Sequence, residues 1–198
     1  MLTAAISSAF GQPPRAYRAG RYGIGPNTVA LLAERGYRID SSVRAAYDYS
    51  RDGGPDFSAL GSAAHRTGAL VELPLTTVFT GLLRHRAVPL YRALGRVPRG
   101  RGLFARAGLL NRVALTPEDM PLDEALHAVD IAIGEGARLI TFSFHSPSLA
   151  PGNTPYVRNA ADLADFHSWW RAMAARLRQL GVTFASLDEI IGAADQPG

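Results

Sequence analysis

Two short segments carry side chains that could perform hydrolytic chemistry. Near the start of the chain, Arg18 and Arg21 lie among glycines and tyrosines; near its end, His145 is followed by Ser146 and a proline. A histidine can donate or accept a proton near neutral pH, and an arginine can hold a carboxylate in its ionised form. Each segment reads as a short apolar strand that runs into a polar turn. We therefore predict that both deliver polar side chains to the carboxyl edge of a parallel sheet, where α/β proteins bind ligands.

Asp40 and Tyr22 extend this candidate site. Asp40 ends a second predicted strand and is the best carboxylate, although an aspartate at a strand end more commonly forms a turn. Arg18 is expected either to form a salt bridge with Asp40 or another strand-end carboxylate, or to hold a catalytic carboxylate. Arg21 and Tyr22 are expected either to contact a substrate or to pack at the surface. The alternative for His145 is a structural hydrogen bond to a loop.

The elements that must position these residues alternate between strands and helices. Apolar periodicity and capping residues predict each element, and the alternation is typical of parallel βαβ units. Two loops, 48–62 and 147–159, are long enough to be functional or mobile. The predicted strands cover 15–18, 37–42, 70–75, 139–144 and 182–185, and the predicted helices cover 3–10, 28–35, 122–135, 160–180 and a terminal helix that begins at Ser186, with Glu189 completing a capping box.

Composition sets broad limits on the class of protein. The chain has 198 residues, of which 47% are hydrophobic and 19% charged, so we predict one domain spanning 1–198. No apolar run is long enough to span a bilayer, and no basic segment precedes the weak apolar start, so we expect a cytoplasmic protein. Cysteine and lysine are both absent, which excludes disulfides, thiolate chemistry and Schiff bases.

Eight arginines are concentrated between Arg84 and Arg112, interleaved with glycine, proline and leucine. Such a segment could cover an anionic polymer or bind acidic lipid. It could also be a surface excursion whose arginines are simply solvated, and charge patterning favours this third interpretation. The segment lacks the aromatic interleaving that is typical of nucleic-acid binding. We therefore expect neither a nucleic-acid partner nor a membrane partner.

The order of the motifs carries a family resemblance. The motifs are Ala-Tyr-Arg-Ala-Gly-Arg-Tyr-Gly, the capped helix and Asp-Ser-Ser that follow it, Leu-Val-Glu-Leu-Pro-Leu-Thr-Thr, and Ser-Phe-His-Ser-Pro. In this order they resemble the polysaccharide deacetylase (NodB-homology) family, and within it a divergent bacterial branch described as WalW-like. The resemblance runs from about residue 10 to residue 191. It implies a distorted (β/α) barrel, so the expected fold class is α/β, a partial barrel of this type missing its first strands.

The resemblance also implies an activity. Members of this family hydrolyse N-acetyl (or O-acetyl) groups on a carbohydrate with water bound to a divalent metal, commonly zinc. In that scheme His145 is the general acid, Arg18 orients the catalytic aspartate, and the backbone amide near Arg21 helps to stabilise the oxyanion. The expected catalytic residues are therefore His145, Arg18 and Asp40, and the expected substrate-binding residues are Arg21, Tyr22 and Ser146.

The family's metal ligands are not found in this chain. They precede the arginine motif, which here begins within the first twenty residues, and the remaining histidines are too scattered to place two zinc ligands on one helix face. We expect a truncated gene product or a natural remnant without metal-dependent activity of its own. The alternatives are an inactive carbohydrate-binding or scaffolding protein of the same fold and, with no positive support, a metal-free hydrolase that uses Asp40 and His145. Open sheet edges predict self-association.

Overall fold

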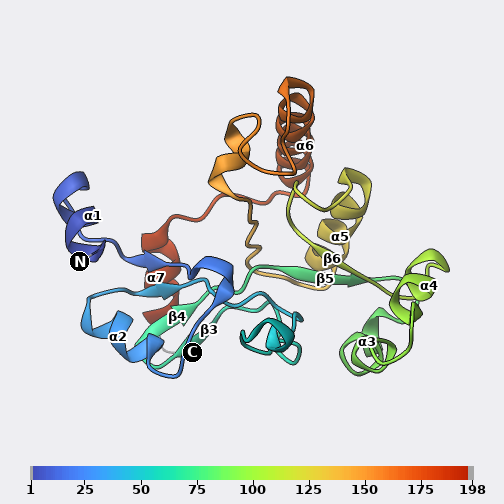
Figure 1. The fold of residues 1–198 in the computed structure, drawn as a ribbon, viewed down its shortest axis with the longest axis horizontal. Helices are drawn as coiled ribbons and strands as arrows, with labels where there is room; N and C mark the ends of the chain where they lie inside the picture. The colour runs from blue at the N-terminus through green and yellow to red at the C-terminus, as the bar shows by residue number, and fades with distance from the viewer. Residues whose placement is uncertain (1, 196–198) are drawn as a thin grey trace. The chain divides into compact units, whose positions relative to one another are not determined.

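The computed structural model describes residues 2–195 and shows a mixed α/β protein with two open sheets (Figure 1). The chain divides into two compact units. Unit 1 runs to Leu75 and includes the segment from Phe184 onward, and unit 2 spans Thr76–Thr183. Within 2–195, no helix combines the length and the apolar character needed to cross a membrane.

Unit 1 is built on a four-stranded sheet with the order β1-β2-β4-β3. The first three of these strands in space are parallel, as the sequence predicts, and β3 runs antiparallel to β4. The three strands predicted for this sheet, 15–18, 37–42 and 70–75, are present but shorter than expected. The strands of this sheet are β1 (Ala16–Tyr17), β2 (Ile39–Asp40), β3 (His65–Thr67) and β4 (Leu70–Glu72), and the helices before β2 are α1 (Leu2–Phe10) and α2 (Thr28–Glu34).

The core of unit 1 lies between α2 and the sheet. Leu32, Tyr37 and Leu70 are buried against one another, because one apolar face of α2 covers the side chains of β4. Gly36 ends α2 with a φ of 80°, a backbone conformation that glycine adopts without steric cost. The chain then turns directly into β2.

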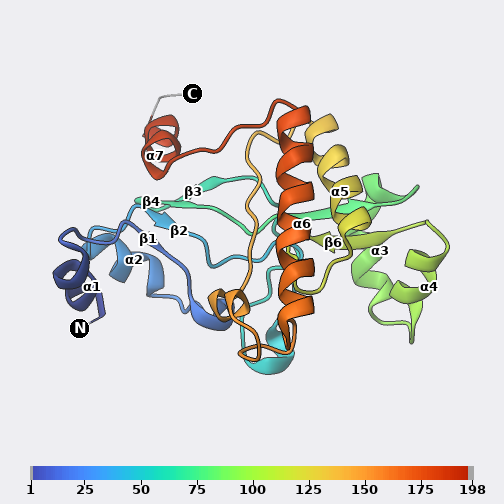
Figure 2. The ribbon, with the colours of Figure 1, turned by 90° about the horizontal axis from the view of Figure 1, so that it is seen from above.

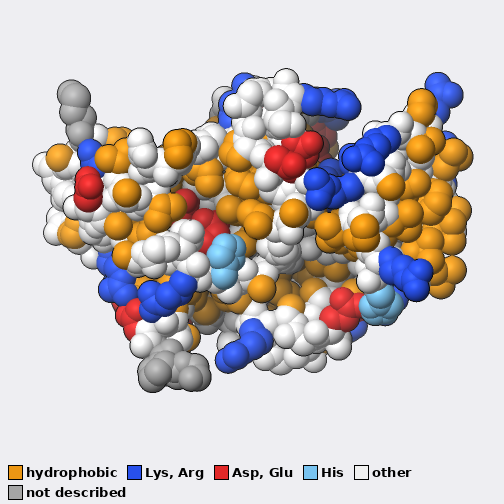
Figure 3. Space-filling model, turned by 90° about the horizontal axis from the view of Figure 1, so that it is seen from below, with side chains coloured by type: hydrophobic (Ala, Val, Ile, Leu, Met, Phe, Trp, Pro, Cys, Tyr) orange, Lys and Arg blue, Asp and Glu red, His pale blue; other side chains and the backbone are white. Residues whose placement is uncertain are grey.

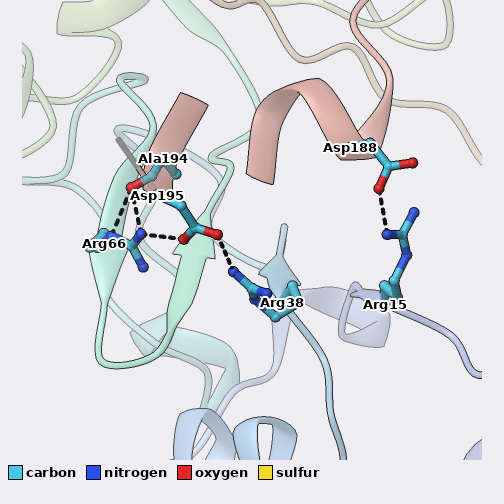
Figure 4. Close-up of polar contacts among 6 residues, drawn as sticks. All are labelled: Arg15, Arg38, Arg66, Asp188, Ala194 and Asp195. Carbon is cyan, nitrogen blue, oxygen red and sulfur yellow. Dashed lines mark hydrogen bonds and ion pairs between the residues drawn. The ribbon is translucent and has the colours of Figure 1, made fainter. Parts of the chain in front are cut away.

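Helix α7 (Leu187–Asp195) is fastened to unit 1 by arginines (Figure 4). Arg15 on the segment before β1 contacts Asp188 at 2.5 Å, and Asp195 accepts from both Arg38 at 2.7 Å and Arg66 at 2.6 Å. The predicted capping box is confirmed at the start of this helix by two reciprocal hydrogen bonds. Ser186 N–H donates to the Glu189 carboxylate, and Glu189 N–H donates to Ser186 Oγ.

Unit 2 is a two-stranded antiparallel sheet covered by two helices. The helices α5 and α6 run beside each other over the sheet (Figure 2). Their shared core includes the fully buried Met173 and Val113, and Trp169, whose Nε1 donates to the Met120 carbonyl at 3.1 Å. The elements of unit 2 are β5 (Thr77–Thr80), η3 (Arg84–Arg86), α3 (Ala87–Leu94), α4 (Gly100–Arg106), β6 (Asn111–Ala114), α5 (Leu122–Gly134), η4 (Ser146–Leu149) and α6 (Ala160–Gln179).

Two predicted strands are wrong. Residues 139–144 form no strand. Thr141 O accepts from Thr76 N–H at 3.0 Å, but Thr141 N–H donates to the Thr76 side chain at 2.9 Å, so a regular ladder does not form there. Residues 182–185 also form no strand, because Val182 N–H closes the end of α6 on the Leu177 carbonyl. Strands β3, β5 and β6 were not predicted. The α/β class is confirmed, whereas the partial barrel stays a prediction.

Candidate functional site

His145 lies at the end of the segment 139–144, immediately before η4. Its Nδ1 is 2.7 Å from Glu118 Oε2, and its backbone N–H donates to Glu118 Oε1 at 2.8 Å. The two side chains differ sharply in exposure: 63% for the imidazole and 4% for the carboxylate. The Tyr156 ring stacks beside the imidazole at 6.1 Å. The histidine is therefore held through Nδ1 by a buried carboxylate, while most of its ring remains exposed to solvent.

Aromatic packing fixes the segment that carries His145. Phe142 packs edge-on against Trp170 at 5.5 Å, and Phe144 packs edge-on against Trp170 at 5.8 Å and against Phe166 at 5.5 Å. Edge-to-face pairs of this kind favour one mutual orientation of the rings. The alternating phenylalanines thus hold the segment against α6 and leave the residue after them at the surface.

Glu118 is held as firmly as the histidine that it contacts. It sits in the turn after β6, where its N–H donates to Thr116 Oγ1. Its Oε1 also accepts from Ser148 Oγ at 2.5 Å, and Ser148 is fully buried beside Thr154 Oγ1. Together with the two contacts from His145, this carboxylate accepts three hydrogen bonds. Such a set of donors fixes its orientation.

This arrangement determines which nitrogen of His145 is free. An ionised carboxylate can only accept, so the proton of a neutral imidazole must reside on Nδ1. The Nε2 atom is then an acceptor on the exposed side of the ring. After it is protonated, the imidazolium is stabilised by the negative charge of Glu118. A carboxylate-oriented histidine of this kind can transfer a proton to or from a bound substrate.

Sequence reasoning missed Glu118, although a signal existed. Thr116-Pro117-Glu118-Asp119 directly follows the apolar run 113–115, which resembles a strand running into a turn. Arg112 ends the arginine-rich stretch that begins at Arg84, so the apolar run directly after it is easily read as part of the same surface excursion. Recognising β6 would have placed Glu118 at a strand end, where the other candidate residues were sought.

A pair of buried carboxyl groups lies in unit 1. Asp40 and Glu72 occupy matched positions on the neighbouring parallel strands β2 and β4, and both are essentially inaccessible to solvent. Asp40 Oδ1 accepts from the N–H and the hydroxyl of Ser42, and Glu72 Oε1 accepts from Val43 N–H at 3.1 Å. Asp40 Oδ2 is buried without a hydrogen-bond partner. An unpaired buried oxygen of this kind favours the protonated form.

Burial raises the pKa of both carboxyl groups. It raises the pKa of Glu72 from 4.5 to about 7, with the nearby Asp40 adding to the effect and Val43 N–H and Arg18 opposing it. Burial likewise raises the pKa of Asp40, opposed by the hydrogen bonds from Ser42 and Ser41. At neutral pH this pair therefore carries less than two negative charges.

Arg18 lies next to this pair but does not form the expected salt bridge with Asp40. Its guanidinium donates to the Ser41 carbonyl at 3.2 Å and to Ser41 Oγ at 3.1 Å. Ser41 Oγ in turn donates to the Leu73 carbonyl. The arginine thus braces the turn after β2, and its role as an orienting residue stays a prediction.

Arg21 and Tyr22 form a tight turn (η1, Gly20–Tyr22) in which both residues have positive φ, 53° and 57°. The Arg21 side chain is exposed. Tyr22 packs on Tyr49 at 5.4 Å, and the Arg44 guanidinium lies 5.6 Å from the Tyr22 ring. Two adjacent non-glycine residues with positive φ are uncommon in proteins. Where such strained conformations do occur, they are concentrated at binding and active sites.

The candidate residues thus form two groups. Arg18, Arg21, Tyr22 and Asp40 belong to unit 1, and His145 with the exposed Ser146 belongs to unit 2. Within residues 2–195, no group of three or more His, Asp or Glu side chains is arranged to hold a metal ion. Comparisons with family models, curated proteins and solved structures give no significant match.

Proposed function

We propose that this protein acts as a carbohydrate deacetylase, hydrolysing N-acetyl (or O-acetyl) groups with His145 as the proton-transferring residue. The observation that carries the proposal is the contact between the exposed imidazole of His145 and the buried carboxylate of Glu118, at 2.7 Å. The imidazole is open to solvent while its Nδ1 contacts a buried carboxylate, which is an arrangement suited to proton transfer. The motif order that resembles the deacetylase family supports the choice of substrate.

The proton transfer follows from the chemistry of amide hydrolysis. Water adds to the acetyl carbon and loses a proton to solvent, and the C–N bond of the resulting tetrahedral intermediate then breaks to release acetate. The departing nitrogen must gain a proton, and the protonated Nε2 of His145 can donate it. Glu118 stabilises the imidazolium before the transfer and keeps the ring in place. The side chain of Ser146 adjoins the histidine and would contact the sugar. We assign no step to a metal ion, because the described residues provide no ligand set for one.

The residues of unit 1 support the proposal less directly. In the deacetylase scheme, Arg21 and Tyr22 contact sugar hydroxyls, Arg18 orients a carboxylate, and Asp40 supplies that carboxylate. The finer fold assignment, a partial (β/α) barrel of the deacetylase type, belongs to the same proposal. Its support is the parallel order of β1, β2 and β4 and the position of Arg18 and Asp40 at the ends of their strands.

The test is release of acetate from a chitin oligosaccharide, measured with and without added zinc chloride. We expect His145→Ala to lower the rate roughly a hundredfold or more, which is the usual contribution of a general acid. The matched control is His127→Ala, an exposed histidine on α5, which should leave the rate unchanged. Binding of the same oligosaccharide is measured in parallel by calorimetry.

The outcomes separate the two candidate functions. Acetate release that depends on His145 supports the deacetylase. Binding of the oligosaccharide without acetate release supports the alternative, a catalytically inactive carbohydrate-binding protein. If the oligosaccharide is neither bound nor deacetylated, both candidate functions are refuted.

A further inference from the structure

The segment between β5 and β6 is rich in positive charge and contains no acidic residue. No aspartate or glutamate occurs from Leu73 to Pro117, a stretch that contains eight arginines. Five of these arginines, Arg86, Arg92, Arg96, Arg99 and Arg106, are exposed and make no side-chain hydrogen bond or ion pair with the described residues. Glu135, the residue that follows α5, pairs with Arg84 at 2.9 Å and thereby neutralises one further charge.

The same segment exposes apolar side chains. Leu82 is 77% exposed, Leu103 is 61% exposed and Val97 is 55% exposed, and Leu83 and Val88 are also exposed. The segment has a hydrophobic core of its own, and these side chains lie outside it. Its other apolar residues form this core, with Ala87, Leu94 and Leu110 buried among aromatic and leucine neighbours. The exposed side chains are therefore surplus to the packing of this segment.

The exposed residues belong to one ordered surface, which we call the α3–α4 surface (residues 82–106). Leu82 N–H donates to the Gly108 carbonyl, and Leu83 N–H donates to the Leu109 carbonyl, so the start of the segment lies beside the end of α4. Arg101 lies over the Tyr91 ring at 4.3 Å and ties α4 to α3. Figure 3 shows arginine side chains beside hydrophobic side chains at the end where α3 and α4 lie.

We propose that the α3–α4 surface binds anionic phospholipid membranes by lying on the bilayer surface. Unpaired arginines attract the lipid phosphates, and the exposed leucines and valine enter the boundary between head groups and acyl chains. The apolar side chains favour lipid over nucleic acid, since a phosphate backbone offers them no apolar environment. Tyr91 and Phe104 pack into the segment's own core, so no exposed aromatic platform is available for bases. This proposal departs from the expectation of solvated arginines and is independent of the proposed deacetylase activity.

The experiment is co-sedimentation of the full chain with vesicles of phosphatidylcholine alone or mixed with phosphatidylglycerol. We expect binding to the mixed vesicles only, and weakening at high salt. The variant R92Q/R96Q/R99Q should bind on the order of a hundredfold more weakly, because each basic residue near an anionic surface contributes about fivefold. The control R51Q/R138Q/R178Q removes three exposed arginines elsewhere and should bind like the parent chain.

A second variant distinguishes lipid from any polyanion. The change L82S/L103S retains all charges and should weaken vesicle binding about tenfold, because less apolar area is buried in the bilayer. Both leucines are exposed, so circular dichroism and thermal melts should match those of the parent chain. Absence of binding to the mixed vesicles would overturn the proposal. A second result would also overturn it: L82S/L103S binds vesicles as tightly as the parent chain, and the parent chain binds a DNA duplex as tightly as it binds vesicles. That result would indicate a surface that binds any polyanion.

Discussion

At His145, one ring nitrogen is committed to a buried carboxylate and the other is left open. Glu118 accepts hydrogen bonds from His145 and Ser148, so the position of the carboxylate is tied to that of the histidine. The buried pair Asp40 and Glu72 presents the opposite case. There the environment disfavours charge, and the pair retains a proton into the neutral range.

Replacing Glu118 tests the first of these arrangements. In the Glu118→Gln variant the amide can donate to Nδ1 as well as accept from it, so neutral His145 should no longer be confined to the Nδ1–H tautomer. Imidazole nitrogen NMR measures this change directly. The rate of acetate release should fall at least about tenfold. The control is Glu34→Gln, an exposed glutamate on α2; an unchanged tautomer in the Glu118 variant would contradict the assigned contact.

The pKa of Glu72 predicts how the stability of unit 1 depends on pH. Between pH 4.5, the ordinary pKa, and about 7, the folded chain retains a proton that the unfolded chain has released. Raising the pH through this window therefore favours unfolding, by about 3 kcal/mol in total, and the loss levels off above the folded-state pKa. Amide hydrogen exchange of Ile39 and Val71, on the two strands concerned, measures the effect.

The matched variant for this prediction is Glu72→Gln. It removes the titrating group and retains an oxygen that can accept from Val43, so most of the pH dependence should disappear and only the part due to Asp40 should remain. A variant whose exchange rates follow pH as steeply as those of the parent chain would show that Glu72 does not hold the proton.

At the scale of elements, short strands and long connections are held by specific local contacts. The asparagine cap of α6 illustrates this, since Asn159 Oδ1 accepts from Asp162 N–H at 3.0 Å. By contrast, Asn27 precedes α2 without a side-chain capping bond. Gly81, which ends β5, has a φ of 98°, and its backbone passes close to the Leu109 carbonyl.

Gly81 is a site where alanine cannot be accommodated. An added Cβ would lie 2.6 Å from Leu109 O, and the positive φ is itself unfavourable for alanine. We expect Gly81→Ala to lower the free energy of unfolding by about 1–3 kcal/mol. The control is Gly102→Ala within α4, where an added Cβ meets open space and should instead stabilise the helix by up to about 1 kcal/mol. Denaturant titration followed by the fluorescence of Trp169 and Trp170 measures both changes.

At the scale of the whole molecule, unpaired strand edges are the feature with the widest consequence. Strand β1 pairs with β2 on one side only, and Ala16 on it is exposed. An exposed edge offers unpaired N–H and C=O groups to another chain. The net charge of +4 opposes association, but it arises in part from the arginines of unit 2.

We therefore predict self-association through the β1 edge. Sedimentation equilibrium should give an apparent mass above the 21.2 kDa of the monomer as the concentration is raised. Ala16→Lys places a charge on the edge and should weaken the association. The control Ala164→Lys adds the same charge to the exposed face of α6 and should have a smaller effect. A parent chain that remains monomeric at every concentration would contradict the prediction.

Features of this protein that depend on residues close together in the sequence could be predicted from it. Capping residues and apolar periodicity predict α2, α5, α6 and α7 closely, because a helix depends on residues within one or two turns of each other. Arg18 and Asp40 were also predicted at strand ends, because a polar residue that directly follows an apolar run is a local signal, whereas the apolar run before His145 forms no strand. The α/β class follows from the alternation of these elements.

Long-range pairing was beyond what the sequence could determine. Whether 139–144 forms a ladder depends on Thr76, about 65 residues away, and β5 and β6 pair across the whole arginine-rich excursion. The Glu118–His145 contact likewise joins two turns that are separated in the chain. The sequence by itself determined α1, α2, α5, α6 and α7 and the α/β class, whereas α3 and α4 were not predicted. Only the tertiary structure decided which carboxylate meets that histidine and which carboxyl groups are buried, because desolvation and distant hydrogen bonds depend on what the folded chain brings together.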